Sequence, residues 1–207
     1  MTKNILVQAL AVVLGIAMLF QSGCAGRSRS SSFYVLSPVA DTEFAKENTP
    51  GERRDISIGI SHVSLPKYLK KPQIVTRTGN NELHLAEFDR WAGKIEEDIG
   101  RVIAENMTYL LLTDKVFSYP TMEAVELDYD VKLDISRFDG TLGGQMDLIV
   151  RWGIFDGAGN SLYDVRATHI KEPTTGGGYD DMVAAQSRAL AHFSRELADA
   201  ILQISGR

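Results

Sequence analysis

The sequence predicts an α+β fold: a mostly antiparallel sheet with two long amphipathic helices packed on it, in a single domain. Three observations lead to this prediction. Two stretches, about 89–112 and from 179 onward, place apolar residues at helical spacing. Several shorter stretches alternate apolar with polar residues, as half-buried strands do, and turns rich in Gly or Pro separate them. The predicted elements follow one another as strands, helix, strands, helix.

The N-terminal segment is expected to determine how the domain is attached to a membrane. Lys3 supplies a positive charge, residues 5–20 are apolar except for Gln8, and Cys24, the one cysteine of the chain, closes the segment. The apolar run is somewhat short for a membrane-spanning helix and lies where the hydrophobic region of a secretory signal lies. The pattern resembles a bacterial lipoprotein signal, in which small residues before the cysteine admit the signal peptidase and the thiol receives a diacylglycerol. It predicts a signal peptide over residues 1–23 and lipidation of Cys24.

Two alternatives to lipidation stay open: an uncleaved N-terminal membrane anchor, and ordinary secretion with a leftover thiol. Gln21 stands where lipoprotein signals usually have an aliphatic residue, although Leu19 and Phe20 keep the region apolar. Each acyl methylene buried in a bilayer contributes about 0.8 kcal/mol to membrane binding, so the acyl chains of a mature lipoprotein hold the protein firmly at the membrane. Ala25, rather than Asp, follows the cysteine, which by resemblance to Gram-negative sorting signals favours the outer membrane.

The rest of the chain has the composition of one folded domain on a tether. Residues 24–32 are small, polar and basic and predict a flexible tether, and residues 33–207 predict a single domain. Because Lys3 is the one charged residue before Cys24, the mature chain keeps 27 acidic against 21 basic residues. No basic patch of the kind that binds nucleic acid stands out. With its cysteine lipidated the domain has no disulfide, so packing must provide its stability.

Before the first helix, the sequence predicts short strands. Residues 33–36 form a first strand, and the charged stretch 41–55 is a loop. Residues 56–61 alternate Ile with Ser or Gly and predict a half-buried strand. Pro66 lacks a ladder donor, so the chain must leave the sheet there. Two further strands pair as a hairpin around a tight turn at 79–81, namely 73–78 and 82–86.

The first helix is expected from about Asp89, as its N-cap, to Leu112, and the second follows the Gly-rich loop 174–178. Their apolar stripes comprise Trp91, Ile95, Ile99, Val102, Ile103, Met107 and Leu110 in the first helix, and Met182, Val183, Leu190, Phe193, Leu197, Ile201 and Ile204 in the second. Between the helices, a short strand at 116–119 precedes three longer strands joined by Gly-containing turns. These predict an antiparallel meander over residues 129–138, 145–155 and 161–171.

No pattern of residues predicts catalysis, a metal site or a bound cofactor. Residues 175–178 precede a helix but lack the Lys-Ser/Thr of a phosphate-binding loop, which favours a flexible connection. The acidic run 96–98 is expected on the solvated face of the first helix. Ser187 has neither the context of a nucleophile elbow nor an evident base. The four histidines lack metal-ligand spacing and fall in three predicted strands and a helix: His62, His84, His169 and His192.

One run, residues 63–77, suggests a contact surface. Two prolines interrupt a strand, Tyr68 and Leu69 stand between lysines and are expected to be exposed, and a strand then resumes and ends in Arg77. The competing interpretation is a connecting loop with Tyr68 folded back on the core, and the residues alone do not decide between the two. On the first interpretation the candidate subunit or partner contacts are Leu65, Pro66, Tyr68, Leu69 and Arg77.

The same run carries a resemblance to a known family, through Val-Ser-Leu-Pro-Lys-Tyr-Leu at 63–69 and Pro-Gln-Ile-Val-Thr-Arg at 72–77. With these residues the chain resembles the ABC-type transport auxiliary lipoproteins, the PqiC/YmbA-like group. The resemblance covers nearly the whole mature chain and departs from the pattern chiefly at Gln21. Further matching positions are 33–36, 83–85, Trp91 as the opening of the first helix, 116–120, Arg137 with Phe138, Trp152 before an Asp-Gly turn, and 179–191.

The resemblance implies an outer-membrane lipoprotein on the periplasmic face, without a cofactor. It implies as partners an inner-membrane MCE-domain protein and its transporter, which move lipids or other hydrophobic molecules between the membranes. The expected mechanism is docking and channelling by a homo-oligomeric ring that receives the end of the MCE tunnel, with phospholipid as a candidate ligand and no role for nucleic acid. The alternatives are an assembly lipoprotein that stabilises an outer-membrane complex without contacting lipid, a solute-capturing monomer, and a periplasmic enzyme.

Overall fold

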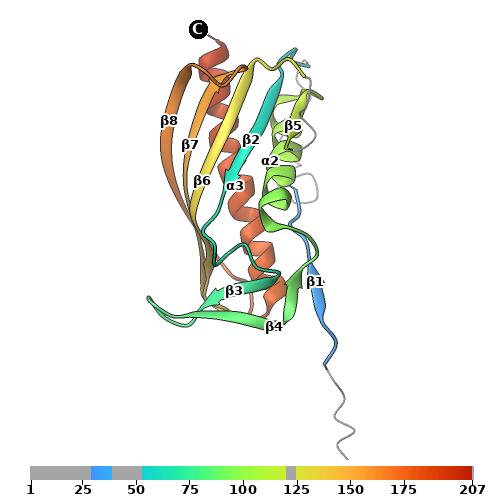
Figure 1. Cartoon of the computed structure of the whole chain (residues 1–207), viewed down its shortest axis with the longest axis vertical. Helices are drawn as coiled ribbons and strands as arrows, with labels where there is room; N and C mark the ends of the chain where they lie inside the picture. Colours follow the sequence, from blue (N-terminus) through green and yellow to red (C-terminus); the bar gives the residue numbers. More distant parts are fainter. Residues whose placement is uncertain (1–28, 39–52, 120–124, 207) are drawn as a thin grey trace, which may run out of the picture. The chain divides into compact units, whose positions relative to one another are not determined.

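The computed structural model describes residues 29–38, 53–119 and 125–206, and the residues from Ser31 onward form one compact unit. Figure 1 shows its arrangement: one large sheet, two long helices beside it, and a small sheet at one end. The elements in chain order are β1 (Ser32–Tyr34), β2 (Ile58–Ser64), β3 (Gln73–Arg77), β4 (Leu83–Trp91), α2 (Ile95–Leu111), β5 (Val116–Ser118), β6 (Tyr129–Gly140), β7 (Gln145–Asp156), β8 (Leu162–Pro173) and α3 (Tyr179–Ser205).

The strands form two mixed sheets, so the expectation of one mostly antiparallel sheet is wrong, although the α+β class with two long helices is confirmed. The large sheet has the order β5-β2-β6-β7-β8, with β2 parallel to both of its neighbours. The small sheet has the order β1-β4-β3, with β1 parallel to β4. Only strands joined by short turns must be antiparallel. β2 reaches its neighbours through long connections that include β3, β4 and α2, and these bring the chain back in the same direction.

The predicted hairpins are confirmed. β3 pairs antiparallel with β4, and β6, β7 and β8 form the expected antiparallel meander. The turn between β6 and β7 depends on glycine. A Cβ at Gly140 would lie 2.2 Å from the carbonyl oxygen of Gln145, and Gly143 adopts a φ of 70°, which L side chains rarely adopt.

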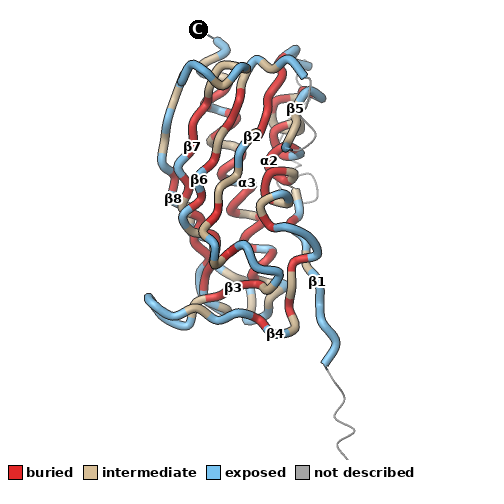
Figure 2. The backbone as a smooth tube through the Cα atoms, in the orientation of Figure 1, coloured by how far each residue is buried: buried red, intermediate tan, exposed pale blue. Residues whose placement is uncertain are grey.

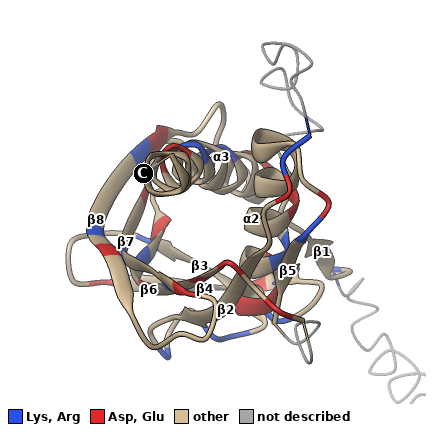
Figure 3. Cartoon of the chain, turned by 90° about the horizontal axis from the view of Figure 1, so that it is seen from above, with Lys and Arg blue, Asp and Glu red and all other residues tan. Residues whose placement is uncertain are grey.

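The core lies between the large sheet and the helices. α2 packs against β2 and β5, α3 packs against β6, β7 and β8, and the two helices contact each other. Seen from above, both helices lie on the same side of the large sheet (Figure 3). The predicted stripes of both helices are buried or half-buried, and Figure 2 shows the buried faces turned toward one another. Between the helices, the buried Asn106 donates its amide N–H to Ser194 Oγ at 3.1 Å.

The first helix begins later than predicted. It starts at Ile95 with Lys94 as N-cap, so the expected N-cap at Asp89 and the helical position of Trp91 are wrong. Residues 89–91 instead continue β4, because both edges of this segment are hydrogen-bonded. The Trp91 N–H donates to the Pro72 carbonyl on one side, at 2.8 Å, and the Ala92 N–H donates to the Tyr34 carbonyl on the other, at 2.9 Å. Asp89 accepts a hydrogen bond from the Tyr34 hydroxyl instead of capping a helix.

Two predicted segments fall partly beyond the structural description. Most of the loop predicted at 41–55 and part of the tether predicted at 24–32 lie outside the described residues. Among the helices that the structure describes, none combines the length and the apolar character needed to cross a bilayer.

Candidate functional site

The predicted lipidation site, Cys24, lies outside the described residues, as does the whole of the predicted signal peptide 1–23. Lipidation of Cys24 and cleavage before it therefore stay predictions. The described chain begins at Arg29 and enters β1 at Ser32.

The predicted contact run leaves β2, forms a loop over residues 65–72 and enters β3. Leu65 and Leu69 are buried, at 6% and 5% exposure, and Tyr68 is half-buried and packs against the core. The expected exposure of Leu69 is therefore wrong: a turn in which the Leu69 N–H donates to the Pro66 carbonyl, at 3.0 Å, turns this side chain inward. Whether the run contacts a subunit or partner stays a prediction.

A buried carboxylate holds the loop to the large sheet. Asp139, near the end of β6, is fully buried. It accepts the Tyr68 hydroxyl at 2.7 Å and the Arg77 Nε–H at 2.5 Å, and the Arg137 Nε–H lies 3.2 Å away. We call these four residues the Asp139 cluster. A carboxylate buried this deeply needs charged and hydrogen-bonding partners, and two of the three come from a loop and a strand more than 60 positions earlier in the chain.

The Asp139 cluster continues across the outer face of the large sheet, the face opposite the helices. Arg137 Nη2 also lies 3.1 Å from Asp147 Oδ2 on β7, and Asp147 Oδ1 lies 2.7 Å from His169 Nε2 on β8. The cluster therefore connects the loop 65–72 with three neighbouring strands. Asp139 lies one position beyond the strand predicted at 129–138, so the sequence pattern places it in a turn and does not indicate this role. The available signal was the acid-free stretch 56–81, whose arginine and tyrosine require an acceptor from elsewhere.

Tyr68→Phe is expected to make stability less dependent on pH in the alkaline range. Burial, and then the hydrogen bond to Asp139, raises the pKa of Tyr68 from its ordinary value of about 10 to about 12. Because folding favours the neutral phenol, the contribution of Tyr68 to stability is complete below about pH 10. This contribution is lost as the pH rises from about 10 to about 12. Urea unfolding of both proteins across this window should show the stability difference shrinking. A stability difference that does not change with pH would contradict the hydrogen bond between Tyr68 and Asp139.

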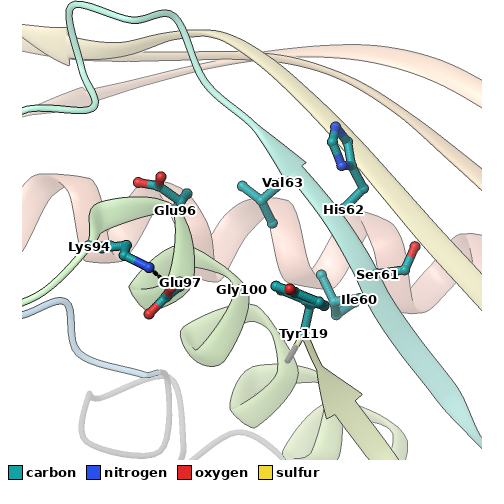
Figure 4. Close-up of a pocket in the computed structure, with 9 residues that line it drawn as sticks. All are labelled: Ile60, Ser61, His62, Val63, Lys94, Glu96, Glu97, Gly100 and Tyr119. Atoms are coloured by element: carbon teal, nitrogen blue, oxygen red, sulfur yellow. Dashed lines mark hydrogen bonds and ion pairs between the residues drawn. The ribbon is translucent and has the colours of Figure 1, made fainter. Parts of the chain in front are cut away.

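A pocket of about 380 Å³ lies between β2 and the first turns of α2 (Figure 4). Ile60, Val63 and Gly100 form its apolar part, and Tyr119 borders it. At its rim Lys94 Nζ lies 2.6 Å from Glu97 Oε1. A neighbouring pocket of about 450 Å³ shares Lys94, Glu97 and Tyr119 with it, so the two form one groove around the start of α2.

The polar side chains that line the groove come from β2, β5 and α2. His62 and Ser61 are neighbouring residues of β2 at a point where the register of β2 against β6 shifts, and Ser118 of β5 lines the second pocket. Among the described residues no group of His, Cys, Asp and Glu is placed to hold a metal ion. The four histidines occupy β2, β4, β8 and α3, in three strands and a helix as predicted.

The remaining polar motifs have structural roles. At the start of α3, Asp181 accepts the Gly178 N–H and the Thr175 hydroxyl, both at 3.0 Å, so a carboxylate already occupies the place where a phosphate would bind. Ser187 is buried and bonds the Val183 carbonyl. Asp98 is not simply solvated, as predicted for the acidic run 96–98. It accepts the Leu36 N–H at 2.8 Å and pairs with Arg101.

Comparisons with known proteins agree on one family. The family model described as ABC-type transport auxiliary lipoprotein component matches residues 34–198. The chain is 21% identical, over 189 residues, to the intermembrane transport lipoprotein PqiC of Escherichia coli K12 and equally to that of Shigella flexneri, covering 91% of this chain and 96% of each relative. A crystal structure of a protein from Xanthomonas campestris has the same fold, with a TM-score of 0.67 at 15% identity, covering 86% of this chain and all of the other.

Proposed function

Because the chain belongs to the ABC-type transport auxiliary lipoprotein family, we propose that it is the outer-membrane-anchored lipoprotein of an MCE-type system that carries lipids or other hydrophobic molecules between two membranes. In this proposal Cys24 carries the acyl anchor on the periplasmic face, and the body docks the end of a periplasmic tunnel. The partners are an inner-membrane MCE-domain protein with its transporter, and further copies of this chain in a ring.

One observation carries the proposal: the family match begins at residue 34, ten positions after Cys24, and extends through most of α3. The part of the chain that resembles transport lipoproteins is therefore the described body itself, directly behind the predicted anchor. The groove around α2, with an apolar part formed by Ile60, Val63 and Gly100, supports a binding role.

We place the subunit or partner contact on the first half of the loop, residues 65–69. Leu65, Tyr68, Leu69 and Arg77 are turned inward or tied to Asp139, and we propose that they act by fixing the backbone of this loop. Pro66 and the exposed Lys67 then present the contact surface. A contact held rigid before binding loses less conformational entropy on association.

Cys24→Ser is expected to abolish acylation. The parent protein, extracted from membranes, should have the mass of residues 24–207 plus acyl chains and should partition into detergent, because each buried methylene contributes about 0.8 kcal/mol. The variant should lack the acyl mass and the partitioning. A variant that still partitions into detergent and retains residues 1–23 would instead establish the uncleaved N-terminal anchor.

The ring and the transport role are tested together by measuring the mass of the detergent-solubilised, acylated protein by light scattering while analysing extracted lipid. A defined oligomer that carries phospholipid, and that binds the MCE-domain protein, is the expected result. A protein that binds its partner tightly but carries no lipid beyond its own anchor would favour the alternative, an assembly lipoprotein that stabilises an outer-membrane complex. Lys67→Glu should weaken the oligomer or the partner complex, and Lys132→Glu, on the distant part of β6, serves as its control.

A further inference from the structure

We infer that the body carries a second membrane contact besides the acyl anchor: a surface formed by Phe33, Val35, Lys70 and Lys71, here called the β1 face, which rests on an anionic phospholipid bilayer. This inference rests on the proposed anchor at Cys24. It concerns the orientation of the body on the membrane, which an acyl anchor behind a tether leaves undetermined.

The apolar part of the β1 face lies at the start of the described chain. Phe33 and Val35 are 66% and 57% exposed, whereas Leu36, close behind them, is buried. Tyr34 points the other way, since its hydroxyl donates to Asp89 at 2.9 Å. Figure 2 shows most of β1 as exposed, at the end of the molecule that also carries β3 and β4. An exposed Phe and Val on an edge strand are the side chains that insert into the interfacial region of a bilayer.

The fold gathers positive charge beside these residues. Two segments, 25–40 and 56–81, contain no Asp or Glu, although the whole chain has a net charge of −5. The second segment includes Lys70 and Lys71. The end of β4 lies between the two segments. Backbone N–H groups there donate to the Tyr34 carbonyl on one edge and to the Pro72 carbonyl on the other. Pro72, which follows Lys71 directly, therefore lies about two strand spacings, roughly 10 Å, from β1.

Nearby acidic residues are mostly neutralised by their own partners. Glu97 pairs with Lys94, and Asp98 pairs with Arg101. Lys70 and Lys71 are exposed and form no ion pair with any described residue; among the described acids, only Glu96 lines a pocket with them. Asp180, exposed at the start of α3, also acts on Tyr34. Lys70 and Lys71 are the unpaired charges of the β1 face that anionic headgroups attract.

The tether places this face next to the bilayer. Seven residues lie between Cys24 and Ser32. Over these eight steps the start of β1 cannot lie more than about 28 Å from the acylated cysteine, even with the chain fully extended. Such a short link keeps the β1 face at a high effective concentration at the lipid surface, so a weak contact suffices. A second group of exposed apolar residues, Leu162, Tyr163 and Val165 on β8, begins at the opposite end of the large sheet, near the C-terminus (Figure 1).

The test uses the full acylated protein in vesicles of phosphatidylethanolamine and phosphatidylglycerol whose acyl chains carry bromine, a quencher of tryptophan. Trp91 and Trp152 are buried and provide a constant background. Phe33→Trp adds a tryptophan on the β1 face, and Leu162→Trp adds one at the remote apolar group as the matched control. The added emission of Phe33→Trp should be quenched and shifted to the blue, whereas that of Leu162→Trp should not.

In the Phe33→Trp background, Lys70→Gln with Lys71→Gln should lower the ratio of membrane-bound to unbound β1 face about 25-fold, at about fivefold per lysine, and so remove most of the quenching. High salt or omission of phosphatidylglycerol should act in the same direction. Mass spectrometry of the same samples reports acylation of Cys24, so a failed anchor is distinguished from a failed contact. An acylated protein with no quenching of Phe33→Trp, or with equal quenching of both tryptophan variants, would overturn the inference.

Discussion

Asp139→Ala is expected to lower the free energy of unfolding by about 3–5 kcal/mol, because it removes one partner of a buried ion pair and leaves the others unpaired. Arg77, at 18% side-chain exposure, would lose its principal carboxylate. The Tyr68 hydroxyl and the Arg137 guanidinium would lose an acceptor at the same time. Urea unfolding at neutral pH measures the change.

Two comparisons make this result specific to the Asp139 cluster. Asp134→Ala, at an exposed position of the same strand, should change stability by less than about 0.5 kcal/mol. Tyr68→Phe should cost much less in the Asp139→Ala background than in the parent, because its acceptor is already gone. Hydrogen exchange at the Leu69 amide should also accelerate in Asp139→Ala, since the cluster holds this loop. A loss of stability below about 1 kcal/mol would show that Asp139 does not hold the loop.

The features that could be predicted from the sequence are those encoded by neighbouring residues. The stripe of α3 and the three strands of the meander follow from local periodicity and from turns rich in glycine, and they are confirmed. The pairing of β1 with β4 and of β2 with β5 and β6 has no local signal, because the paired residues lie dozens of positions apart. The antiparallel prediction failed for that reason.

The start of α2 shows how tertiary hydrogen bonds override a periodic pattern. Trp91 lies four positions before Ile95 and extends the apolar stripe of the helix by one turn, so periodicity alone includes it. Its backbone is instead bound between Pro72 and the end of β1. Residues 89–94 taken alone do not indicate that their backbone pairs with Pro72 and with the end of β1.

The candidate sites could be predicted from the sequence to different degrees. Cys24 stands out because a lone cysteine ends an apolar segment, a pattern confined to two dozen residues. The run 63–77 was recognisable as unusual, but whether its apolar side chains face outward depends on Asp139, 62 positions beyond Arg77. The β1 face depends in the same way on β4, which brings two acid-free segments together. Such juxtapositions follow from topology, which local patterns do not specify.

Trp152→Ala is the second large effect: we expect a loss of about 3–5 kcal/mol, the usual cost of deleting a buried tryptophan. Trp152, on β7, is 1% exposed and packs edge-to-face on Phe193 of α3, with ring centroids 5.8 Å apart. Its Nε1–H donates to Thr168 Oγ1 on β8 at 2.9 Å, and that hydroxyl donates to Glu196 on α3, also at 2.9 Å. One side chain thus joins the sheet to the helix by packing and by a polar chain.

Trp152→Phe separates these two contributions. It keeps most of the packing on Phe193 but removes the indole donor, so we expect a loss of about 1–3 kcal/mol, between the parent and the alanine variant. Val165→Ala, on the exposed outer face of the neighbouring strand β8, should change stability by less than about 0.5 kcal/mol and serves as the control. Urea unfolding monitored by circular dichroism gives all three values, since the variants differ in tryptophan emission. If Trp152→Phe costs as much as Trp152→Ala, the polar chain through Thr168 to Glu196, rather than the filled volume, holds α3 to the sheet.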